Sequence, residues 1–146
     1  MNSLSIRIAS QDDLNDILFL ENQTETERYS KDVLLASLNN DTYLNIVAFN
    51  NDICVGYLTS NIVLDECSLL KIIVDKNYRK KGVGGELISF LESQLKAKGV
   101  TNILLEVRED NVGAISLYEK CCFVKQGIRK NYYNDCDALL YGKCIK

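Results

Sequence analysis

Residues 79–85, Arg79-Lys80-Lys81-Gly82-Val83-Gly84-Gly85, lie between an apolar segment and an amphipathic one, and this stretch decides the fold. Before it, Leu69–Val74 has the composition of a buried strand. After it, apolar residues recur at helical spacing, at Val83, Leu87, Ile88, Leu91 and Leu95. The sequence therefore predicts a strand, a glycine-rich loop and a helix. The free N–H groups and positive dipole end of such a helix bind anions, and glycine lets a pyrophosphate approach the backbone.

The glycine spacing in this loop disfavours two familiar nucleotide-binding loops. A dinucleotide-binding fingerprint needs a third glycine where Leu87 stands. A Walker A loop needs Gly-Lys-Ser/Thr, whereas here Gly85 is followed by Glu86. The residues therefore indicate a diphosphate cradle for a ligand other than NAD or ATP, with an ordinary turn as the alternative.

The remaining segments alternate between strand-like and helix-like patterns and contain no linker or repeat. Together they predict one domain, residues 1–146, with an α/β sandwich around a sheet of mixed topology. Strands are expected at Ser5–Ala9, Tyr43–Phe49, Ile53–Val63, Glu66–Val74, Ile103–Val107, Phe123–Ile128 and Ala138–Cys144. Helices are expected from Ser10 to Glu21, from Ser30 to Leu38, from the glycine loop to Gly99 and from Asn111 to Lys120.

The composition excludes several kinds of site. The chain has no histidine, so it holds no Ser-His-Asp triad, no Cys-His dyad and no histidine-ligated metal. Its six cysteines show no C-x2-C spacing, and we expect no metal site and mostly buried, reduced cysteines. A net charge of −3 argues against nucleic acid as a direct partner, and the lack of a long apolar run argues against a membrane. We expect a cytoplasmic protein.

One carboxylate interrupts an otherwise apolar strand. Ile103–Val107 is nearly continuous in its apolar character, so we expect a central strand that is buried on both faces. A buried carboxylate without a partner costs several kcal/mol. Glu106 therefore either faces a polar cleft or pairs with a cation such as Arg108, and the residues alone leave both readings open.

Two sets of residues resemble a known family. The pattern Arg79-x-x-Gly82-x-Gly84, between an apolar strand and an amphipathic helix, resembles the Gln/Arg-x-x-Gly-x-Gly/Ala signature of the GNAT superfamily of acetyl-CoA-dependent N-acetyltransferases. The downstream half is similar to the RimI-type ribosomal-protein-alanine N-acetyltransferases at Leu105-Glu106-Val107-Arg108, Asn111, Ala114-Ile115, Leu117-Tyr118-Glu119, Phe123 and Arg129-Lys130-Asn131-Tyr132-Tyr133. The resemblance implies a GNAT-type α/β fold with a mixed, mostly antiparallel central sheet flanked by helices and strands that splay at the acetyl-CoA site.

The resemblance also implies roles for individual residues. The strand residues that contact pantetheine fall on Ile72, Ile73 and Val74. The pyrophosphate loop falls on Lys80, Lys81, Gly82, Val83, Gly84 and Gly85, with Arg79 opening the signature, and a later acetyl-CoA contact falls on Asn111. Glu106 corresponds to the general base and Tyr118 to the general acid. Tyr132 and Tyr133 lie in the segment placed beside the acceptor.

The activity implied is transfer of acetyl from acetyl-CoA, the acyl-donor substrate, to the N-terminal α-amine of a protein, with a ribosomal protein as partner and no metal. An α-amine with a pKa near 8 is roughly one-tenth to one-third neutral near neutral pH, so it needs little activation and no histidine. Lysine or small-molecule acetylation and a non-catalytic acyl-CoA-binding regulator are the alternatives. Four acidic residues are candidates for attracting a basic acceptor, although acidic runs are usually solvated surface: Glu25, Glu27, Asp65 and Glu66.

The chain departs from the family pattern at one turn. Cys121-Cys122 stands before Phe123, where the family has Leu-Gly. If that glycine serves a turn with positive φ, Cys122 carries about 1–3 kcal/mol of backbone strain.

Overall fold

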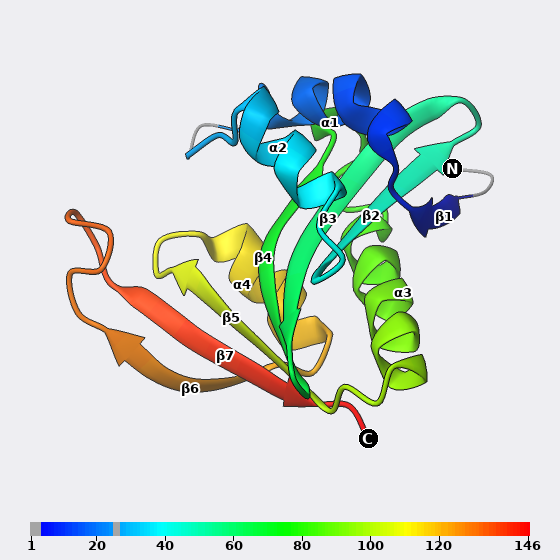
Figure 1. Ribbon diagram of the computed structural model, residues 1–146. Coiled ribbons are helices and arrows are strands. Elements are labelled where there is room, and N and C mark those ends of the chain that lie inside the picture. Colours follow the sequence, from blue (N-terminus) through cyan, green and yellow to red (C-terminus); the bar gives the residue numbers. More distant parts are fainter. Residues whose placement is uncertain (1–3, 25–26) are drawn as a thin grey trace.

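The computed structural model describes residues 4–24 and 27–146, which form a seven-stranded sheet with helices on both faces (Figure 1). The strands are β1 (Ser5–Ile8), β2 (Tyr43–Asn50), β3 (Ile53–Val63), β4 (Glu66–Val74), β5 (Asn102–Arg108), β6 (Val124–Arg129) and β7 (Ala138–Cys144). The α-helices are α1 (Leu14–Glu21), α2 (Lys31–Leu38), α3 (Val83–Ala97) and α4 (Val112–Lys120), and short 3-10 turns cover Gln11–Asp13 and Lys76–Tyr78. The predicted elements are confirmed within a few residues. The expected first helix differs at its start, because Ser10 caps the 3-10 turn that precedes α1.

The sheet is mixed and mostly antiparallel, as expected. Its strand order is β1-β2-β3-β4-β5-β7-β6, and β4–β5 is its parallel pair. That pairing covers only Glu66–Ser68 against Asn102–Leu104. Beyond these residues β4 and β5 diverge, and Figure 1 shows the resulting opening in the middle of the sheet. The splayed strands predicted by the resemblance are therefore confirmed.

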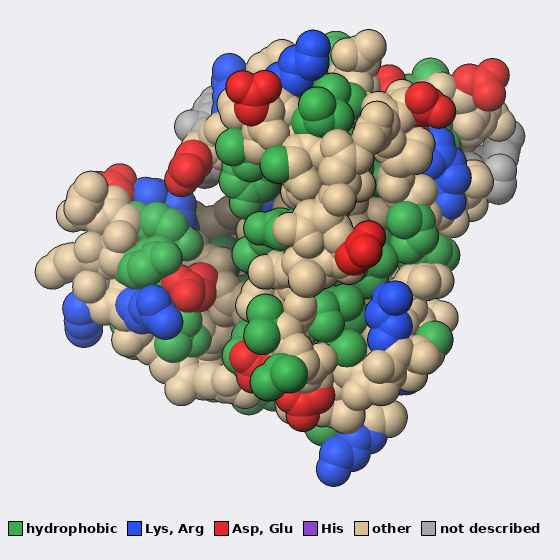
Figure 2. Space-filling model, viewed as in Figure 1, with side chains coloured by type: hydrophobic (Ala, Val, Ile, Leu, Met, Phe, Trp, Pro, Cys, Tyr) green, Lys and Arg blue, Asp and Glu red, His purple; other side chains and the backbone are tan. Residues whose placement is uncertain are grey.

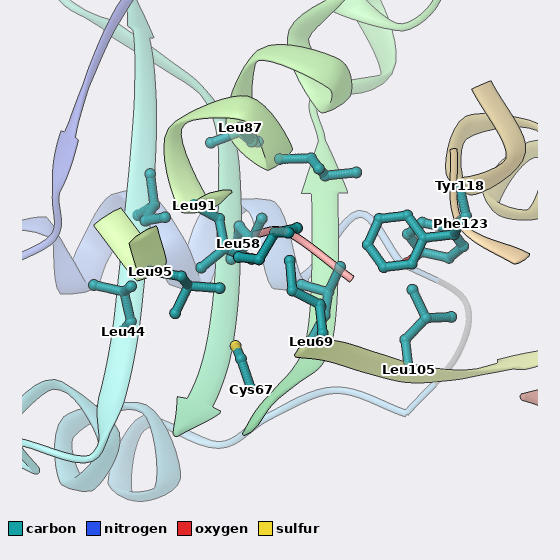
Figure 3. Close-up of a cluster of buried hydrophobic side chains, with 14 of the residues drawn as sticks. Leu44, Leu58, Cys67, Leu69, Leu87, Leu91, Leu95, Leu105, Tyr118 and Phe123 are labelled. Carbon is teal, nitrogen blue, oxygen red and sulfur yellow. The ribbon is translucent and has the colours of Figure 1, made fainter. Parts of the chain in front are cut away.

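Two hydrophobic clusters hold the layers together, one on each face of the sheet. The larger cluster joins α3 and α4 to the strands, and Figure 3 shows leucines of α3 facing strand leucines at one end and Tyr118 with Phe123 and Leu105 at the other. The smaller cluster lies under α1 and α2 and contains Ile17, Leu20, Leu34, Val47, Cys54, Tyr57 and Ile73. The two faces of the sheet are therefore covered by different helices.

A bulge in β4 decides which of its side chains face which layer. The register with β3 passes from Ser60↔Leu69 to Thr59↔Lys71, so Leu70 is an extra residue on β4. An extra residue exchanges the two faces of a strand. Leu69 consequently packs in the α3 cluster, whereas Ile73, four residues later, packs in the α1 cluster.

Strand β5 corrects one expectation. It is central, but it is buried on one face only: Ile103, Leu105 and Val107 are buried toward α3 and α4, while Leu104 is half-buried and Glu106 is exposed. The reason is that α1 and α2 pack over β2, β3 and β4 and leave the same face of β5 uncovered.

The cysteines are less buried than expected. Cys54 and Cys67 lie in the core, but Cys121 and Cys136 are half-buried, and Cys122 and Cys144 are exposed. Cys122 lies in a turn after α4, and Cys144 ends the last strand, so neither position is enclosed by a helix layer. In the described part of the chain, none of the helices combines the length and apolar character that crossing a bilayer requires.

Candidate active site

The opening between β4 and β5 is flanked by two loops. The described parts of the connection between α1 and α2 (residues 22–24 and 27–30) lie near the C-terminal end of β4, and the β6–β7 loop (residues 130–137) lies near the C-terminal end of β5 (Figure 1). Figure 2 shows a hollow between the lobe at the left, which contains the β6–β7 region, and the rest of the molecule. A ligand that enters this hollow meets the diverging edges of both strands.

The edge of β4 that faces the opening offers backbone hydrogen-bonding groups. Asp75 donates its N–H to Val55 O on β3 at 2.9 Å, so the alternation of a strand directs the backbone groups of Val74 and Ile72 toward β5. Arg79 Nε donates to Val74 O at 3.2 Å on that side. Ile73 differs, because its backbone groups face β3, where it pairs with Tyr57, and its side chain packs in the α1 cluster. Two of the three residues predicted to contact pantetheine thus present backbone groups to the opening.

The glycine loop ends in a helix N-terminus with free donors. Gly82 is the N-cap of α3 with φ +88, and no side chain caps the helix. The N–H groups of Val83, Gly84 and Gly85 have no acceptor among the described residues. Lys80 also has a positive φ, of 61°, and this pair of left-handed residues turns the chain into the helix. The arrangement fits an anion such as a pyrophosphate, as predicted from the sequence.

Close packing between α3 and α4 explains one of the glycines. A Cβ on Gly84 lies only 2.8 Å from Leu117 Cδ2, so a side chain there displaces Leu117 on α4. Gly85 has nothing within 4 Å of the same position. On α4, Asn111 is the N-cap, and its Oδ1 accepts from Ala114 N at 3.1 Å. This leaves the Nδ2 donor of Asn111 without an acceptor among the described residues.

Glu106 lies on the uncovered face of β5 with 32% of its side chain exposed. Its Oε1 is 3.7 Å from Arg129 Nη1, which is a loose ion pair with a largely exposed partner. Arg108, the cation considered from the sequence, is not its partner, because Arg108 binds Asp110 and Asp135. Each of the two readings of Glu106 is thus met in part, because the carboxylate is exposed on the uncovered face and also pairs loosely with a cation, Arg129.

Tyr118 approaches the opening from the other face of the sheet. Its side chain is 8% exposed and packs against Phe123, with ring centroids 5.8 Å apart (Figure 3). Its hydroxyl makes no hydrogen bond to the part of the chain that the structure describes. Burial, reinforced by nearby Tyr133, raises the pKa of Tyr118 to about 12. The phenol therefore keeps its proton at neutral pH and has no competing acceptor among residues 4–24 and 27–146.

The turn after α4 fixes Tyr118 in place. Cys122 has φ 70 and donates its N–H to Glu119 O, while Phe123 donates its N–H to Tyr118 O at 3.0 Å. These two bonds and the Tyr118–Phe123 contact make a Schellman motif, in which the position of Cys122 is the one that glycine usually occupies. The positive φ considered for Cys122 is confirmed.

The two tyrosines predicted near the acceptor lie in the β6–β7 loop. Tyr132 and Tyr133 form an edge-to-face pair with centroids 5.0 Å apart, and Tyr132 is exposed. Arg108 stacks on Tyr133 at 5.2 Å. Burial, and then the Glu106 carboxylate, raise the pKa of Tyr133. Tyr133 in turn contributes to the raised pKa of Tyr118. Tyr133 is thus within electrostatic range of both Glu106 and Tyr118.

The acidic residues predicted to attract a basic acceptor do not form one surface. Asp65 and Glu66 lie where β3 turns into β4, which is the end remote from the opening. Glu27 lies in the α1–α2 connection, and Glu25 lies outside the described residues. No group of three potential metal-binding side chains occurs in residues 4–24 and 27–146.

Sequence reasoning missed the polar contacts that hold the two loops. Lys71 pairs with Glu21, and Arg108 pairs with Asp135. These pairs join residues far apart in the chain, and no local pattern marks them.

Comparisons with known proteins show the family to which the chain belongs. Residues 11–123 match the acetyltransferase (GNAT) family. The chain is 38% identical over 103 residues to the ribosomal protein bS18-alanine N-acetyltransferase of Escherichia coli K12, which covers 70% of each chain. It is 33% identical over 133 residues to the enzyme of that name from Salmonella typhimurium, which covers 91% of this chain and 88% of that one.

Solved structures show the same fold. The crystal structure of the ribosomal-protein-S18-alanine N-acetyltransferase from Escherichia coli has a TM-score of 0.89 at 30% identity and covers 99% of this chain and 95% of that chain. Ard1 from Thermoplasma volcanium has a TM-score of 0.88 at 26% identity, with 98% of each chain covered. The chain therefore belongs to the acetyltransferase (GNAT) family and is an acetyl-CoA-dependent N-acetyltransferase of the RimI type.

Proposed function

We propose that this enzyme transfers the acetyl group of acetyl-CoA to the α-amine of the N-terminal alanine of ribosomal protein bS18, in the cytoplasm. The relatives named above carry this substrate in their names. The observation that carries the proposal is the placement of Glu106 and Tyr118 on opposite faces of the sheet beside the β4–β5 opening. A thioester in that opening has a base on one side and an acid on the other.

Acetyl-CoA is bound by backbone groups at the β4 edge and at the start of α3. The pantetheine arm extends the sheet along β4, where Ile72 and Val74 offer their backbone groups, while Ile73 holds the strand against α1. The pyrophosphate lies on the N–H groups of Val83, Gly84 and Gly85. Exposed cationic side chains surround that position and neutralise phosphate charge: Arg79, Lys80 and Lys81. The free Nδ2 of Asn111 donates to the same ligand.

The chemical step needs one proton acceptor and one proton donor. The neutral α-amine attacks the thioester carbonyl, so a C–N bond forms and the C–S bond breaks. Glu106 accepts the proton that the amine loses, directly or through water, and Tyr118 gives its proton to the leaving thiolate. An α-amine has a pKa near 8, so a useful fraction is neutral before Glu106 acts. No metal takes part in this scheme.

The acceptor peptide lies on the face of the sheet that carries Glu106. Tyr133 lies within electrostatic range of that carboxylate, and exposed Tyr132 packs edge-to-face against Tyr133. The rigid rings of tyrosine provide contact area at little conformational cost, which suits an extended peptide. Tyr132 and Tyr133 are therefore the proposed acceptor contacts.

The experiment that tests the acceptor is intact-mass analysis after incubation with acetyl-CoA. One synthetic peptide carries the N-terminal residues of bS18 with a free alanine amine. A second has the same sequence with a blocked N-terminus and an available lysine. We expect one acetyl group on the free N-terminus of the first peptide and none on the second. Acetylation confined to lysine overturns the α-amine assignment.

The roles of Glu106 and Tyr118 are tested with matched variants. Glu106→Gln and Tyr118→Phe are each expected to lower kcat by roughly 10²-fold or more, the range typical of a lost general acid or base. Glu109→Gln is the control for a neighbouring exposed carboxylate, and Tyr141→Phe is the control for a buried tyrosine whose hydroxyl donates to Glu119. If the control variants lose as much activity as the test variants, the assigned roles are wrong.

A further inference from the structure

A buried ion pair joins the first helix to the donor strand. Lys71 Nζ of β4 lies 3.0 Å from Glu21 Oε1 at the end of α1, and 3.4 Å from Glu21 Oε2. The lysine side chain is 15% exposed and the glutamate side chain 1% exposed. Both charges are thus largely removed from water and depend on each other for solvation.

The same two residues hold the chain that follows α1. Lys71 Nζ also donates to Glu27 O at 2.8 Å and lies 3.9 Å from the centroid of the Tyr29 ring. Glu21 Oε1 accepts the N–H of Tyr29 at 3.1 Å. The charged pair therefore fixes residues on the far side of the α1–α2 connection. We call Glu21, Lys71 and Tyr29, with these contacts, the β4 clamp.

A second set of bonds fastens the near side of the connection to β4. Gln23 Nε2 donates to Asp75 Oδ2 at 2.9 Å, and Gln23 Oε1 accepts from Lys76 N at 3.0 Å. Asp75 is itself buried and accepts from Asn77 N. Residues 22–24 and residues 27–30 are thus each tied to β4 or to the turn that follows it.

The β4 clamp connects the acetyl-CoA side of the proposed site to its acceptor side. Lys71 immediately precedes Ile72, whose backbone faces the donor edge, and the bulge at Leu70 turns the Lys71 side chain toward α1. The α1–α2 connection borders the hollow on the face of the sheet that carries Glu106 (Figures 1 and 2). A shift of the Lys71 side chain therefore also shifts Glu27 and Tyr29, which lie on one wall of the acceptor side.

Stability alone does not account for this pair. Replacing a buried ion pair by apolar residues of similar volume is often neutral or stabilising, because desolvation offsets the attraction. A hydrophobic pair lacks directional contacts. Lys71, by contrast, contacts the Glu21 carboxylate, the Glu27 carbonyl and the Tyr29 ring at the same time. The pair is therefore suited to fixing a segment in one position.

We propose that Lys71 is a positioning residue for the acceptor, which acts by holding residues 22–24 and 27–30 as one wall of the acceptor site; this rests on the proposed function. The variant Lys71→Met keeps the length of the side chain and removes its charge. We expect its KM for the bS18 peptide to rise about tenfold, while the KM for acetyl-CoA stays within twofold of wild type.

The chain offers a matched control in a second ion pair. Lys143 of β7 lies 2.8 Å from Glu92 of α3, with side chains 21% and 17% exposed. Lys143 stands opposite Ile103, at the end of the sheet where β4 and β5 are still paired. Lys143→Met therefore removes a similar pair away from the opening, and we expect both KM values to stay within twofold. Both variants are assayed well below their melting temperatures.

An activity-independent readout separates this inference from the proposed function. Loss of the clamp frees Glu21 from Lys71, so hydrogen exchange at the Tyr29 amide is expected to be at least tenfold faster in Lys71→Met than in wild type or Lys143→Met. Unchanged exchange, or equal rises in both KM values, overturns the positioning role. If wild type leaves the bS18 peptide unmodified, the proposed acceptor is wrong, and the same comparison is made with the amine that the enzyme does acetylate.

Discussion

Arg108 and Asp135 form an ion pair in which Arg108 Nη2 lies 2.9 Å from Asp135 Oδ2, and this pair ties the β6–β7 loop to the end of β5. Arg108 also binds Asp110 through Nε at 3.0 Å and stacks on the ring of Tyr133. Glu106 is two residues away on the same strand. The arginine therefore holds Tyr133 at a fixed place beside the proposed base, as Lys71 holds the opposite wall.

The first prediction concerns this arginine. Arg108→Met releases Asp135 and the Tyr133 ring, so the KM for the acceptor peptide is expected to rise about fivefold to tenfold, with the KM for acetyl-CoA unchanged. The melting temperature is expected to change little, because exposed ion pairs contribute little to stability. The control is Lys130→Met, whose partner Asp137 lies 3.6 Å from a largely exposed ammonium. Equal effects of the two substitutions on peptide KM contradict the role of Arg108.

The second prediction concerns the pH profile. Because burial raises the pKa of Tyr118 to about 12, the phenol stays mainly protonated until the pH approaches that value, and its capacity to donate is lost as the pH rises through it. An ordinary tyrosine, with a pKa near 10, is already half ionised at pH 10. We expect kcat/KM to rise with pH as the acceptor amine loses its proton near pH 8, and then to stay level to at least pH 10. A fall centred near pH 10 that disappears in Tyr118→Phe is the contrary result.

Local pattern was sufficient for some parts of the site and not for others. The segment from Leu69 to Leu95 was predictable, because strand, glycine loop and helix each have a signal within a few residues. The environment of Glu106 was not predictable. Alternation along β5 places Glu106 and Leu105 on different faces of the strand, but it does not show which face the helices cover. The orientation of Lys71 was not predictable either, because the bulge at Leu70 decides which face of the sheet its side chain lies on.

The partners of charged residues were the least predictable feature. Arg108 was considered as a partner for Glu106 because the two are close in sequence, yet it binds Asp110 and Asp135. Lys71 pairs with Glu21, a residue 50 positions away. Such pairs form only when the sheet and the helices pack together. Residues with a local signal were therefore predicted as candidates for the site, whereas the ion pairs of Arg108 and Lys71 were not predicted.

The third prediction separates two adjacent glycines of the loop. Gly84→Ala places a Cβ 2.8 Å from Leu117 Cδ2, so Leu117 and the start of α4 must shift. We expect the affinity for CoA to fall about threefold to tenfold and the stability to fall by about 1 kcal/mol. Gly85→Ala meets open space and is expected to leave both unchanged or to stabilise α3 slightly. Calorimetric CoA binding and thermal melts check this, and a larger loss of affinity in Gly85→Ala contradicts it.

The fourth prediction concerns the turn that holds Tyr118. Cys122 has φ 70, and a residue with a Cβ costs about 1–2 kcal/mol in that left-handed conformation, whereas glycine adopts it freely. Cys122 is exposed, so its removal gives up little packing. Cys122→Gly is therefore expected to raise the free energy of unfolding by about 1 kcal/mol, or roughly 3 °C in melting temperature.

Cys121 is the control for Cys122, because the two residues have the same side chain and different backbone conformations. Cys121 has φ −88, is half-buried and packs against the main hydrophobic cluster. Cys121→Gly is expected to lower stability by about 1 kcal/mol, through lost contact and added freedom of the unfolded chain. Denaturant melts distinguish the two substitutions by the sign of the change. If Cys122→Gly also destabilises, the left-handed turn is not strained, and the Cys122 side chain contributes contacts that its exposure does not indicate.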